Sequence, residues 1–307
     1  MTHPAGTRLM LPVLVLGLIA LIGVEVPVIA QDDVSGFPAE GPLRILFIHH
    51  SCGGQLLAAP GDQVGGARGS GERCIYRSHP NGGDLRARLE AEGHEIHEAS
   101  YESTVGEDTD IRHWRAKFTT MIDRILMTDH QDRLYQDGST NHVVVFKSCY
   151  PNNDFVGAGE PPGDPDSGEL TIANAKAAYE SLLPIFREQP DVLFIAMTAP
   201  ARAEPKLGVI DRVRAWLGRE PSAADHAREF NGWLADGDEG WLDGYGLPNV
   251  GVFDYYDVLT DHGVSNWSRY ATGDGSDSHP SGDGNGVAAE QFSAGLKELI
   301  HQMRVWE

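Results

Sequence analysis

Five short apolar runs alternate with segments of helical periodicity, and this alternation constrains the fold more than any other feature of the sequence. The runs lie at residues 43–48, 95–99, 142–146, 192–197 and 250–253. Three of them are nearly continuous in apolar residues, which is typical of strands that are buried on both faces. The five runs are therefore predicted to be the strands of one sheet.

Helical patterns lie between and after these runs, at 83–93, 108–128, 171–189, 223–236 and 286–306. Gly93 favours a helix end, and Thr171 favours a helix start. Glycine-rich and acidic loops are expected at 58–72, 154–169 and 272–286. Strands that alternate with helices indicate a parallel sheet with helices on both faces and right-handed crossovers. Because no internal repeat or linker is visible, residues 31–307 are expected to form a single α/β domain.

The first thirty residues form a separate segment. Arg8 precedes an apolar run at 9–22, and a pattern of small residues follows at 28–30. This order is typical of a secretory signal peptide, and the run is short for the alternative, a membrane anchor. We expect residues 1–30 to be a signal peptide. The mature protein is then expected to be secreted or periplasmic, with no stable membrane span after cleavage.

Charge and cysteine content narrow the classes of partner and site. With 45 acidic and 24 basic side chains, the formal net charge is −21, which argues against nucleic acid or an anionic membrane as a partner. The three cysteines are Cys52, Cys74 and Cys149. Their odd number leaves at least one thiol free, and the sequence does not determine any pairing. No Cys-x-x-Cys pair exists, so they fit no zinc pattern.

Ligands of open parallel sheets bind outside the carboxyl ends of the strands, so the segments after the five runs are the candidate site. Ser51 follows the first run, and Gly53 comes two residues later. Glycine permits close approach of a ligand, and N–H groups at a helix start could stabilise an oxyanion. The alternatives are that Ser51 only caps the helix, or that the neighbouring Cys52 is the nucleophile.

The third run is followed by the turn Asn152-Asn153-Asp154. A side-chain amide at this edge of the sheet is a good oxyanion donor. The alternative is a turn in which asparagine is merely favoured.

His279 lies just before the final helical pattern, flanked by Asp274 and Asp277. A histidine can take the proton of a serine hydroxyl, and a carboxylate can hold its ring and stabilise the imidazolium. The alternative is a solvated acidic loop. Ser51, an asparagine and the acidic histidine segment thus occur in order along the chain, all expected at one edge of the sheet.

This arrangement resembles the SGNH hydrolases, also called GDSL-type esterases. The resemblance implies a flavodoxin-like three-layer α/β/α sandwich with a five-stranded parallel sheet. It assigns Ser51 in "IHHSCGG" as the nucleophile and Gly106 in "YESTVGED" as the glycine after the second strand. It assigns Asn153 or Asn152 in "PNND" to the family's Gly-x-Asn-Asp block, and His279 in "DSHPS" to the Asp-x-x-His block.

Two positions depart from the family pattern: Pro151 replaces the glycine before the asparagine, and Ser276 stands where the acid is expected. Asp277 is therefore the first choice for the acid and Asp274 the second, with a Ser–His dyad as the alternative. The oxyanion donors implied are the Ser51 N–H, a Gly53 or Gly106 N–H, and an asparagine amide.

The resemblance implies ester hydrolysis through an acyl-enzyme on Ser51, without a metal or organic cofactor. The expected substrate is a small-molecule or carbohydrate ester, and an acetylated carbohydrate is one candidate. Two other functions remain open on these residues. One is an O-acyltransferase that uses the same serine, and the other is a non-catalytic carbohydrate- or ligand-binding protein on the same scaffold.

Overall fold

A five-stranded parallel sheet forms the centre of the computed structural model, which describes residues 36–206, 208 and 221–306. Its strands are β1 (Arg44–Ile48), β5 (Glu95–Ala99), β8 (Val143–Lys147), β9 (Leu193–Met197) and β10 (Val250–Phe253). They coincide with the five apolar runs to within one residue at either end. Every neighbouring pair is parallel, which confirms the predicted sheet.

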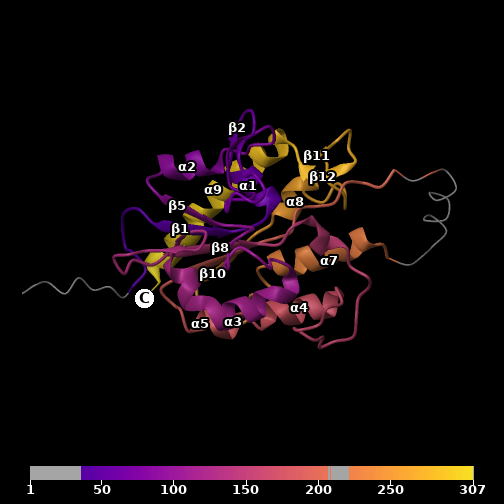
Figure 1. Ribbon diagram of the computed structural model, residues 1–307. Helices are drawn as coiled ribbons and strands as arrows, with labels where there is room; N and C mark the ends of the chain where they lie inside the picture. Colours follow the sequence, from indigo (N-terminus) through magenta and orange to yellow (C-terminus); the bar gives the residue numbers. More distant parts are fainter. Residues whose placement is uncertain (1–35, 207, 209–220, 307) are drawn as a thin grey trace, which may run out of the picture. The chain divides into compact units, whose positions relative to one another are not determined.

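The strand order β10-β9-β8-β1-β5 is the order of flavodoxin-like sheets. From β1 the chain enters a helix on one face, whereas from β8 it continues to a helix on the other face (Figure 1). Because β1 and β8 are neighbours, a crevice opens between the segments that leave them. This place in the sheet is where a ligand site is expected.

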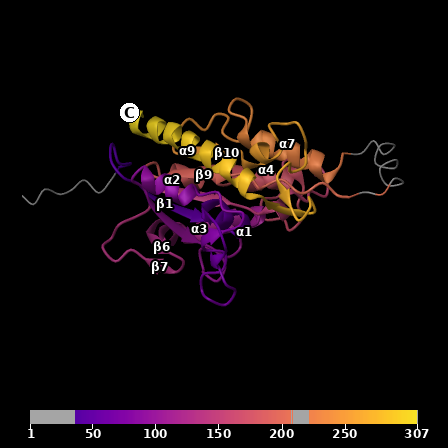
Figure 2. The ribbon, with the colours of Figure 1, turned by 90° about the horizontal axis from the view of Figure 1, so that it is seen from above.

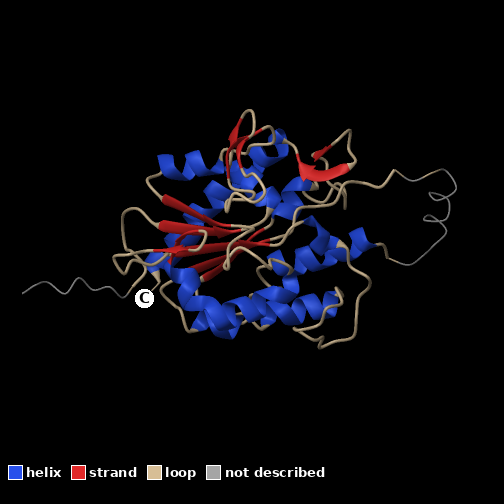
Figure 3. Cartoon of the chain, in the orientation of Figure 1, coloured by secondary structure: helices blue, strands red, loops and turns tan. Residues whose placement is uncertain are grey.

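Helices cover both faces of the sheet (Figures 1 and 3). One face carries α1 (Ser51–Leu57), α2 (Leu85–Ala91), α8 (Tyr255–Leu259) and α9 (Gly282–Val305). The other face carries α3 (Ile111–Met127), α4 (Ile172–Glu180), α5 (Leu183–Arg187) and α7 (Ala223–Ala235). The long α9 packs along α1, α2 and α8, and Figure 2 shows it passing beside α2. The predicted three-layer α/β/α architecture is confirmed.

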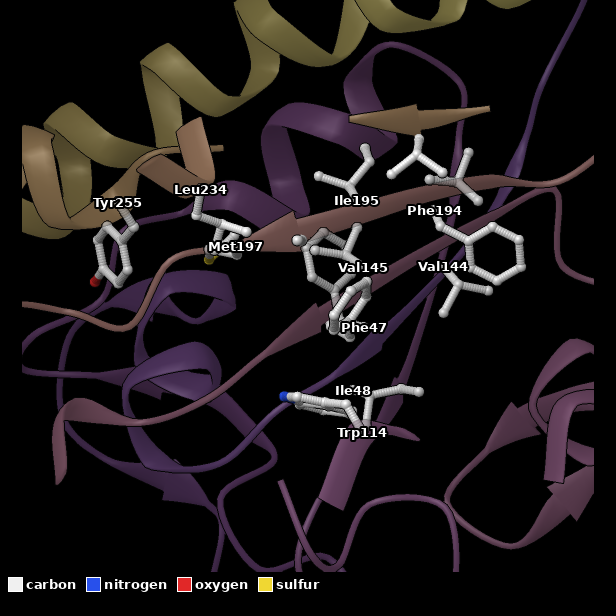
Figure 4. Close-up of a cluster of buried hydrophobic side chains, with 14 of the residues drawn as sticks. Phe47, Ile48, Trp114, Val144, Val145, Phe194, Ile195, Met197, Leu234 and Tyr255 are labelled. Carbon is white, nitrogen blue, oxygen red and sulfur yellow. The ribbon is translucent and has the colours of Figure 1, made fainter. Parts of the chain in front are cut away.

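The hydrophobic core lies on both faces of β8 and β9, whose residues are all buried. Phe118, Phe146, Phe186 and Phe194 pack against one another there, mostly edge-to-face, with ring centroids 4.1–5.9 Å apart. Figure 4 shows Phe194 in this core together with Trp114 of α3. Burying each such ring stabilises the fold by about 1.5–3 kcal/mol. The core thereby fixes the strand ends that carry the candidate site.

The predicted helix at 171–189 is divided into α4 and α5. Thr171 caps α4 as expected, since its side chain accepts a hydrogen bond from the Asn174 N–H at 3.2 Å. A proline, Pro184, occupies the first turn of α5. Because proline has no N–H and disfavours a continuous helix, the chain starts a new helix there.

The final helix starts earlier than predicted, at Gly282 instead of residue 286. The Ser281 side chain caps it by accepting from the Gly284 N–H at 3.3 Å. The glycine-rich composition of this turn concealed the helix start. Gly93 does end its helix: it takes a φ of +93° and donates to the Glu90 carbonyl at 2.9 Å.

Small sheets and one short helix occupy segments in which the sequence indicates mostly loops (Figure 3). They comprise β2 (Ala59–Pro60), β3 (Val64–Gly65), β4 (Tyr76–His79), β6 (Thr128–His130), β7 (Arg133–Leu134), β11 (Ala271–Thr272), β12 (Asp277–Pro280) and the 3-10 helix η1 (Tyr150–Asn153). The antiparallel pair β11–β12 places an ordered hairpin directly before α9.

From residue 36 on, the described residues form one compact unit. The expected signal peptide, residues 1–30, lies outside the described residues. Within the described ranges, no helix is long and apolar enough to cross a membrane.

Candidate active site

Ser51 is the first residue of α1, directly beyond the carboxyl end of β1. His50 precedes the helix in an extended conformation, so the chain turns sharply and leaves the serine at the sheet edge. The Ser51 Oγ lies 3.3 Å from the His279 Nε2 and 3.4 Å from the Cys149 Sγ. Three distant parts of the sequence therefore meet at this hydroxyl.

His279 lies on β12 and is held by the carboxylate two residues before it. Its Nδ1 is 2.7 Å from the Asp277 Oδ1, and its backbone N–H donates to the same oxygen at 3.0 Å. Burial alone would raise the pKa of Asp277, but these two hydrogen bonds and the nearby imidazole lower it below its ordinary value. The Tyr150 ring packs edge-to-face against the His279 ring with centroids 5.2 Å apart. The imidazole is thus fixed in position with its Nε2 directed at Ser51.

Neither Ser276 nor Asp274, the second choice for the acid, is hydrogen-bonded to the His279 ring in the described residues. Ser276, three residues before His279, donates its hydroxyl to the Gly273 carbonyl at 2.6 Å. Asp274 sits at a positive φ of 53° in the same turn and is exposed, and its side chain makes no hydrogen bond with the described residues. The structure brings Asp277, and not Asp274, against His279.

The two glycines expected to stabilise an oxyanion have their N–H groups engaged. The Gly53 N–H donates to the His50 carbonyl at 2.8 Å, and the Gly106 N–H donates to the Ser103 Oγ at 2.9 Å. Close packing explains the glycine at position 106, because a Cβ there would lie 2.0 Å from the Ser100 carbonyl oxygen. In this structure neither glycine presents a free donor.

The side-chain amides of Asn152 and Asn153 are also engaged, which corrects the expectation that one of them faces the serine. The Asn152 Nδ2 donates to the Asp110 Oδ1 at 3.0 Å and to the Cys149 carbonyl at 3.3 Å. The Asn153 Nδ2 donates to the carbonyls of residues 199 and 200 at 3.1 and 3.0 Å. Each amide has only two hydrogens, so both asparagines act here as structural links between loops.

His49 and His50 diverge after β1, as expected for adjacent extended residues. The buried His49 has its Nε2 3.0 Å from the Glu98 Oε1. His50 lies between the Gly106 carbonyl, 2.8 Å from its Nε2, and the Thr109 Oγ1, 3.0 Å from its Nδ1. Burial lowers the pKa of His50 to about 3, against the opposing effect of the Gly106 hydrogen bond. A neutral His50 thus ties the Ser51 turn to the Gly106 loop.

Asp277 and Tyr150 line a cleft of about 560 Å³ beside His279. Trp267 and Arg202 line it as well, and the Arg202 guanidinium lies over the Tyr150 ring at 5.3 Å. Two other aromatic residues near this edge of the sheet do not line the cleft. Tyr101 stacks on His50 with centroids 3.4 Å apart, and Tyr270 packs against the hydrophobic core.

Tyr150 and Arg202 are the site residues that sequence reasoning missed. Both follow carboxyl ends of strands, Tyr150 after β8 and Arg202 after β9. Their positions after strand ends therefore indicated that they could lie at the site, but they belong to no recognisable motif. No group of three or more metal-binding side chains occurs in the described ranges.

Comparisons with known proteins give little resemblance. No protein-family model and no curated protein matches the chain. One solved crystal structure aligns with a TM-score of 0.40 and 16% identity, over 84% of this chain and 97% of that one. Another, a family two carbohydrate esterase from Clostridium thermocellum in complex with cellohexaose, aligns with a TM-score of 0.37 and 15% identity, over 86% of this chain and 66% of that one. Both similarities are too low to support a shared function.

Proposed function

We propose that this protein is an exported serine ester hydrolase of the SGNH type that forms an acyl-enzyme on Ser51. The observation that carries the proposal is the continuous chain of contacts Asp277–His279–Ser51 at the carboxyl edge of the sheet. A nucleophile, a base within reach of it and a carboxylate that orients the base are the elements of serine catalysis. The pattern of residues 1–30 supports export.

In this mechanism His279 takes the Ser51 proton as the hydroxyl oxygen attacks the ester carbonyl carbon. Asp277 holds the Nδ1–H and stabilises the imidazolium that forms. The imidazolium then gives its proton to the leaving alcohol, and the acyl-enzyme remains. In the second half-reaction His279 removes a proton from water as the water oxygen attacks the acyl carbonyl. The imidazolium then returns the proton to the Ser51 Oγ as its bond to the acyl carbon breaks, which releases the acid and free Ser51.

The Ser51 N–H at the start of α1 is the first oxyanion donor in this proposal. The second is the Gly106 N–H, because only the neutral Ser103 hydroxyl holds it. Breaking the hydrogen bond to Ser103 costs about 0.5–1.5 kcal/mol. The hydrogen bond that the Gly106 N–H would form to an oxyanion is charge-assisted and roughly twice as strong. An asparagine amide is a less favourable donor. Freeing the Asn152 amide would break its hydrogen bond to the Asp110 carboxylate, and freeing the Asn153 amide would break one of its two hydrogen bonds to backbone carbonyls.

The cleft beside Asp277 supports a polar, ring-shaped substrate. Trp267 offers an aromatic ring in this cavity. Arg202, whose Nε is paired with the Asp154 Oδ1 at 3.0 Å, offers its remaining guanidinium N–H groups beside it. Aromatic faces combined with a few polar groups suit a sugar, which has both apolar ring faces and hydroxyls. A small acyl ester of a carbohydrate is the substrate class that we propose.

Labelling with a fluorophosphonate tests the site directly, because this reagent reacts with serines activated by a base. Mass spectrometry of the labelled protein is expected to place the adduct on Ser51. His279→Ala should lose the label while keeping its circular dichroism spectrum. The absence of label on folded wild-type protein would refute the hydrolase and leave a binding protein on the same scaffold.

Release of acetate from an acetylated oligosaccharide in water is the functional measurement. If acetyl groups instead appear on an added sugar acceptor at a rate above hydrolysis, the protein is an acyltransferase. Ser51→Ala is the matched control, since it removes one oxygen atom and leaves the His279–Asp277 pair in place.

A further inference from the structure

Two thiols lie within contact distance of each other at the proposed nucleophile. The sulfurs of Cys52 and Cys149 are 3.5 Å apart, and the Cys149 sulfur is also 3.4 Å from the Ser51 Oγ. Cys52 is the second residue of α1, and Cys149 lies in the loop after β8. Both cysteines are free. The chain of side-chain contacts at the site therefore continues beyond Ser51 into a cysteine pair.

The two thiols differ in access to solvent and in acidity. Cys149 is partly exposed, whereas Cys52 is fully buried. The hydrogen bond with Cys52 lowers the pKa of Cys149 well below its ordinary value despite burial, and the Lys147 charge and the Ser51 hydroxyl act in the same direction. Burial raises the pKa of Cys52. An accessible, acidic thiol beside a buried one is the usual arrangement of an attacking and a resolving cysteine.

Lys147 supplies a positive charge beside this pair. It precedes Cys149 by two residues, is 2% exposed, and donates to the Ser148 carbonyl at 3.0 Å. In the part of the chain that the structure describes, no carboxylate pairs with it. A buried ammonium without a carboxylate favours an anion nearby, and the Cys149 thiolate can be that anion.

We propose that Cys52 and Cys149 form a reversible disulfide next to Ser51, and that Ser51 reacts faster when this disulfide is present. The geometry requires the two sulfurs to approach by about 1.5 Å to reach bonding distance. The disulfide itself is independent of the proposed function, whereas its effect on Ser51 rests on that function.

The oxidant is a low-molecular-weight disulfide. The Cys149 thiolate attacks one sulfur of that disulfide, a mixed disulfide forms, and one small thiolate leaves. The Cys52 sulfur then attacks the Cys149 sulfur, its proton passes to solvent or to the leaving thiolate, and the second small thiolate is expelled. Two protein thiols are thus oxidised by two electrons, and one small disulfide is reduced to two thiols.

The reduced pair opposes attack by Ser51 in two ways. The hydroxyl has a single proton, and a thiolate at 3.4 Å competes with the His279 Nε2 at 3.3 Å to accept it. The thiolate also places negative charge beside the oxyanion that develops in the transition state. A disulfide removes this charge and leaves Lys147 to favour the oxyanion. Removing one charge from a partly buried site at this distance is expected to raise the rate about tenfold or more.

The first measurement is differential alkylation of the full chain. The reduced protein is incubated with glutathione disulfide, free thiols are capped, disulfides are then reduced, and the released thiols receive a second label. Mass spectrometry is expected to find the second label on Cys52 and Cys149 together, with Cys74 carrying the cap. The proposal would be overturned if both Cys52 and Cys149 carried the cap at every ratio of oxidised to reduced glutathione, or if either formed a disulfide with Cys74.

The second measurement is the rate of fluorophosphonate labelling of Ser51 in the reduced and oxidised protein. Cys149→Ala is expected to react at the oxidised wild-type rate under both conditions, because it carries no thiolate. Cys52→Ala should gain no rate with glutathione disulfide, since it cannot close the bridge. The control Cys74→Ser should respond as wild type does, because its side chain packs in a separate cluster with Ala58 and Tyr76.

An equal or lower labelling rate in the oxidised protein would overturn the activating role of the disulfide. If the bridge forms but Ser51 takes no label in either state, the proposed hydrolase fails while the thiol pair stands. The two proposals therefore fail separately.

Discussion

Replacing Asp254 by asparagine is expected to stabilise the protein at neutral pH and to have little effect at acidic pH. Asp254 follows β10 and caps α8. Its Oδ1 accepts hydrogen bonds from the Thr198 hydroxyl at 2.9 Å and from the Asp257 N–H at 3.0 Å. An asparagine Oδ1 can accept both. The substitution therefore removes the ionisable group and keeps the cap.

The magnitude follows from the pKa of the carboxyl group. Burial raises the pKa of Asp254 from 3.8 to about 6, against the opposing effect of its two hydrogen bonds. A raised pKa means that the folded state binds the proton more tightly, so wild-type stability is lost as pH rises from about 4 through about 6. At about 1.4 kcal/mol per pH unit the loss is about 3 kcal/mol, and water around this partly buried side chain reduces it to about 2 kcal/mol.

Urea unfolding followed by circular dichroism at pH 4 and pH 7 measures the effect. Asp254→Asn should be more stable than wild type by about 2 kcal/mol at pH 7 and by less than about 1 kcal/mol at pH 4. Asp225→Asn is the control with the opposite sign, because hydrogen bonds from the Ser222 backbone N–H and hydroxyl lower the pKa of Asp225. It should be less stable than wild type at pH 7, and this deficit should shrink as pH falls. A stability difference for Asp254→Asn that stays constant or declines with rising pH would refute the reasoning.

Two further predictions concern the proposed triad and one close backbone contact. Asp277→Asn should slow fluorophosphonate labelling of Ser51 by about 10²- to 10⁴-fold, because the imidazole loses its anionic partner. Asp274→Asn, the control, should label at the wild-type rate. Equal labelling rates for the two variants would mean that Asp277 takes no part in the mechanism. Gly106→Ala should lower the free energy of unfolding by about 3 kcal/mol or more, because its Cβ would lie 2.0 Å from the Ser100 carbonyl oxygen. Gly286→Ala in α9 has no atom within 4 Å of the new Cβ and should gain about 0.5–1 kcal/mol in urea unfolding; if both glycine variants changed stability alike, the packing argument would fail.

Much of the fold could be predicted from the sequence because strand and helix periodicities are local properties. The five apolar runs gave the strands, and the segment after the first run gave Ser51. Helix breaks were less visible: Pro184 divides one predicted helix, and a glycine-rich turn conceals the start of α9 at Gly282. In both places the helix boundary depends on one or a few residues, whereas the periodicity of apolar residues averages over several turns.

The candidate site was only partly predictable. The sequence placed Ser51 and His279 at the same edge of the sheet, since the carboxyl ends of parallel strands meet there. It left Asp277 and Asp274 as alternatives for the acid, and the β11–β12 hairpin brings Asp277 alone against the ring. Which of the two aspartates faces His279 depends on the backbone conformation of the turn, and the positions of acidic residues in the sequence do not determine that conformation.

The sequence by itself determined the parallel α/β sheet and the position of Ser51 at the end of its first strand, because both follow from residue order and periodicity. Only the tertiary structure decided which polar groups at the site remain available to bind a substrate or stabilise an oxyanion. The amides of Asn152 and Asn153 have acceptors that are distant in sequence, and the Cys149 sulfur meets Ser51 and Cys52 across almost a hundred residues of chain. Hydrogen bonds and thiol contacts at a site depend on atoms within a few ångströms, and long-range packing sets those positions.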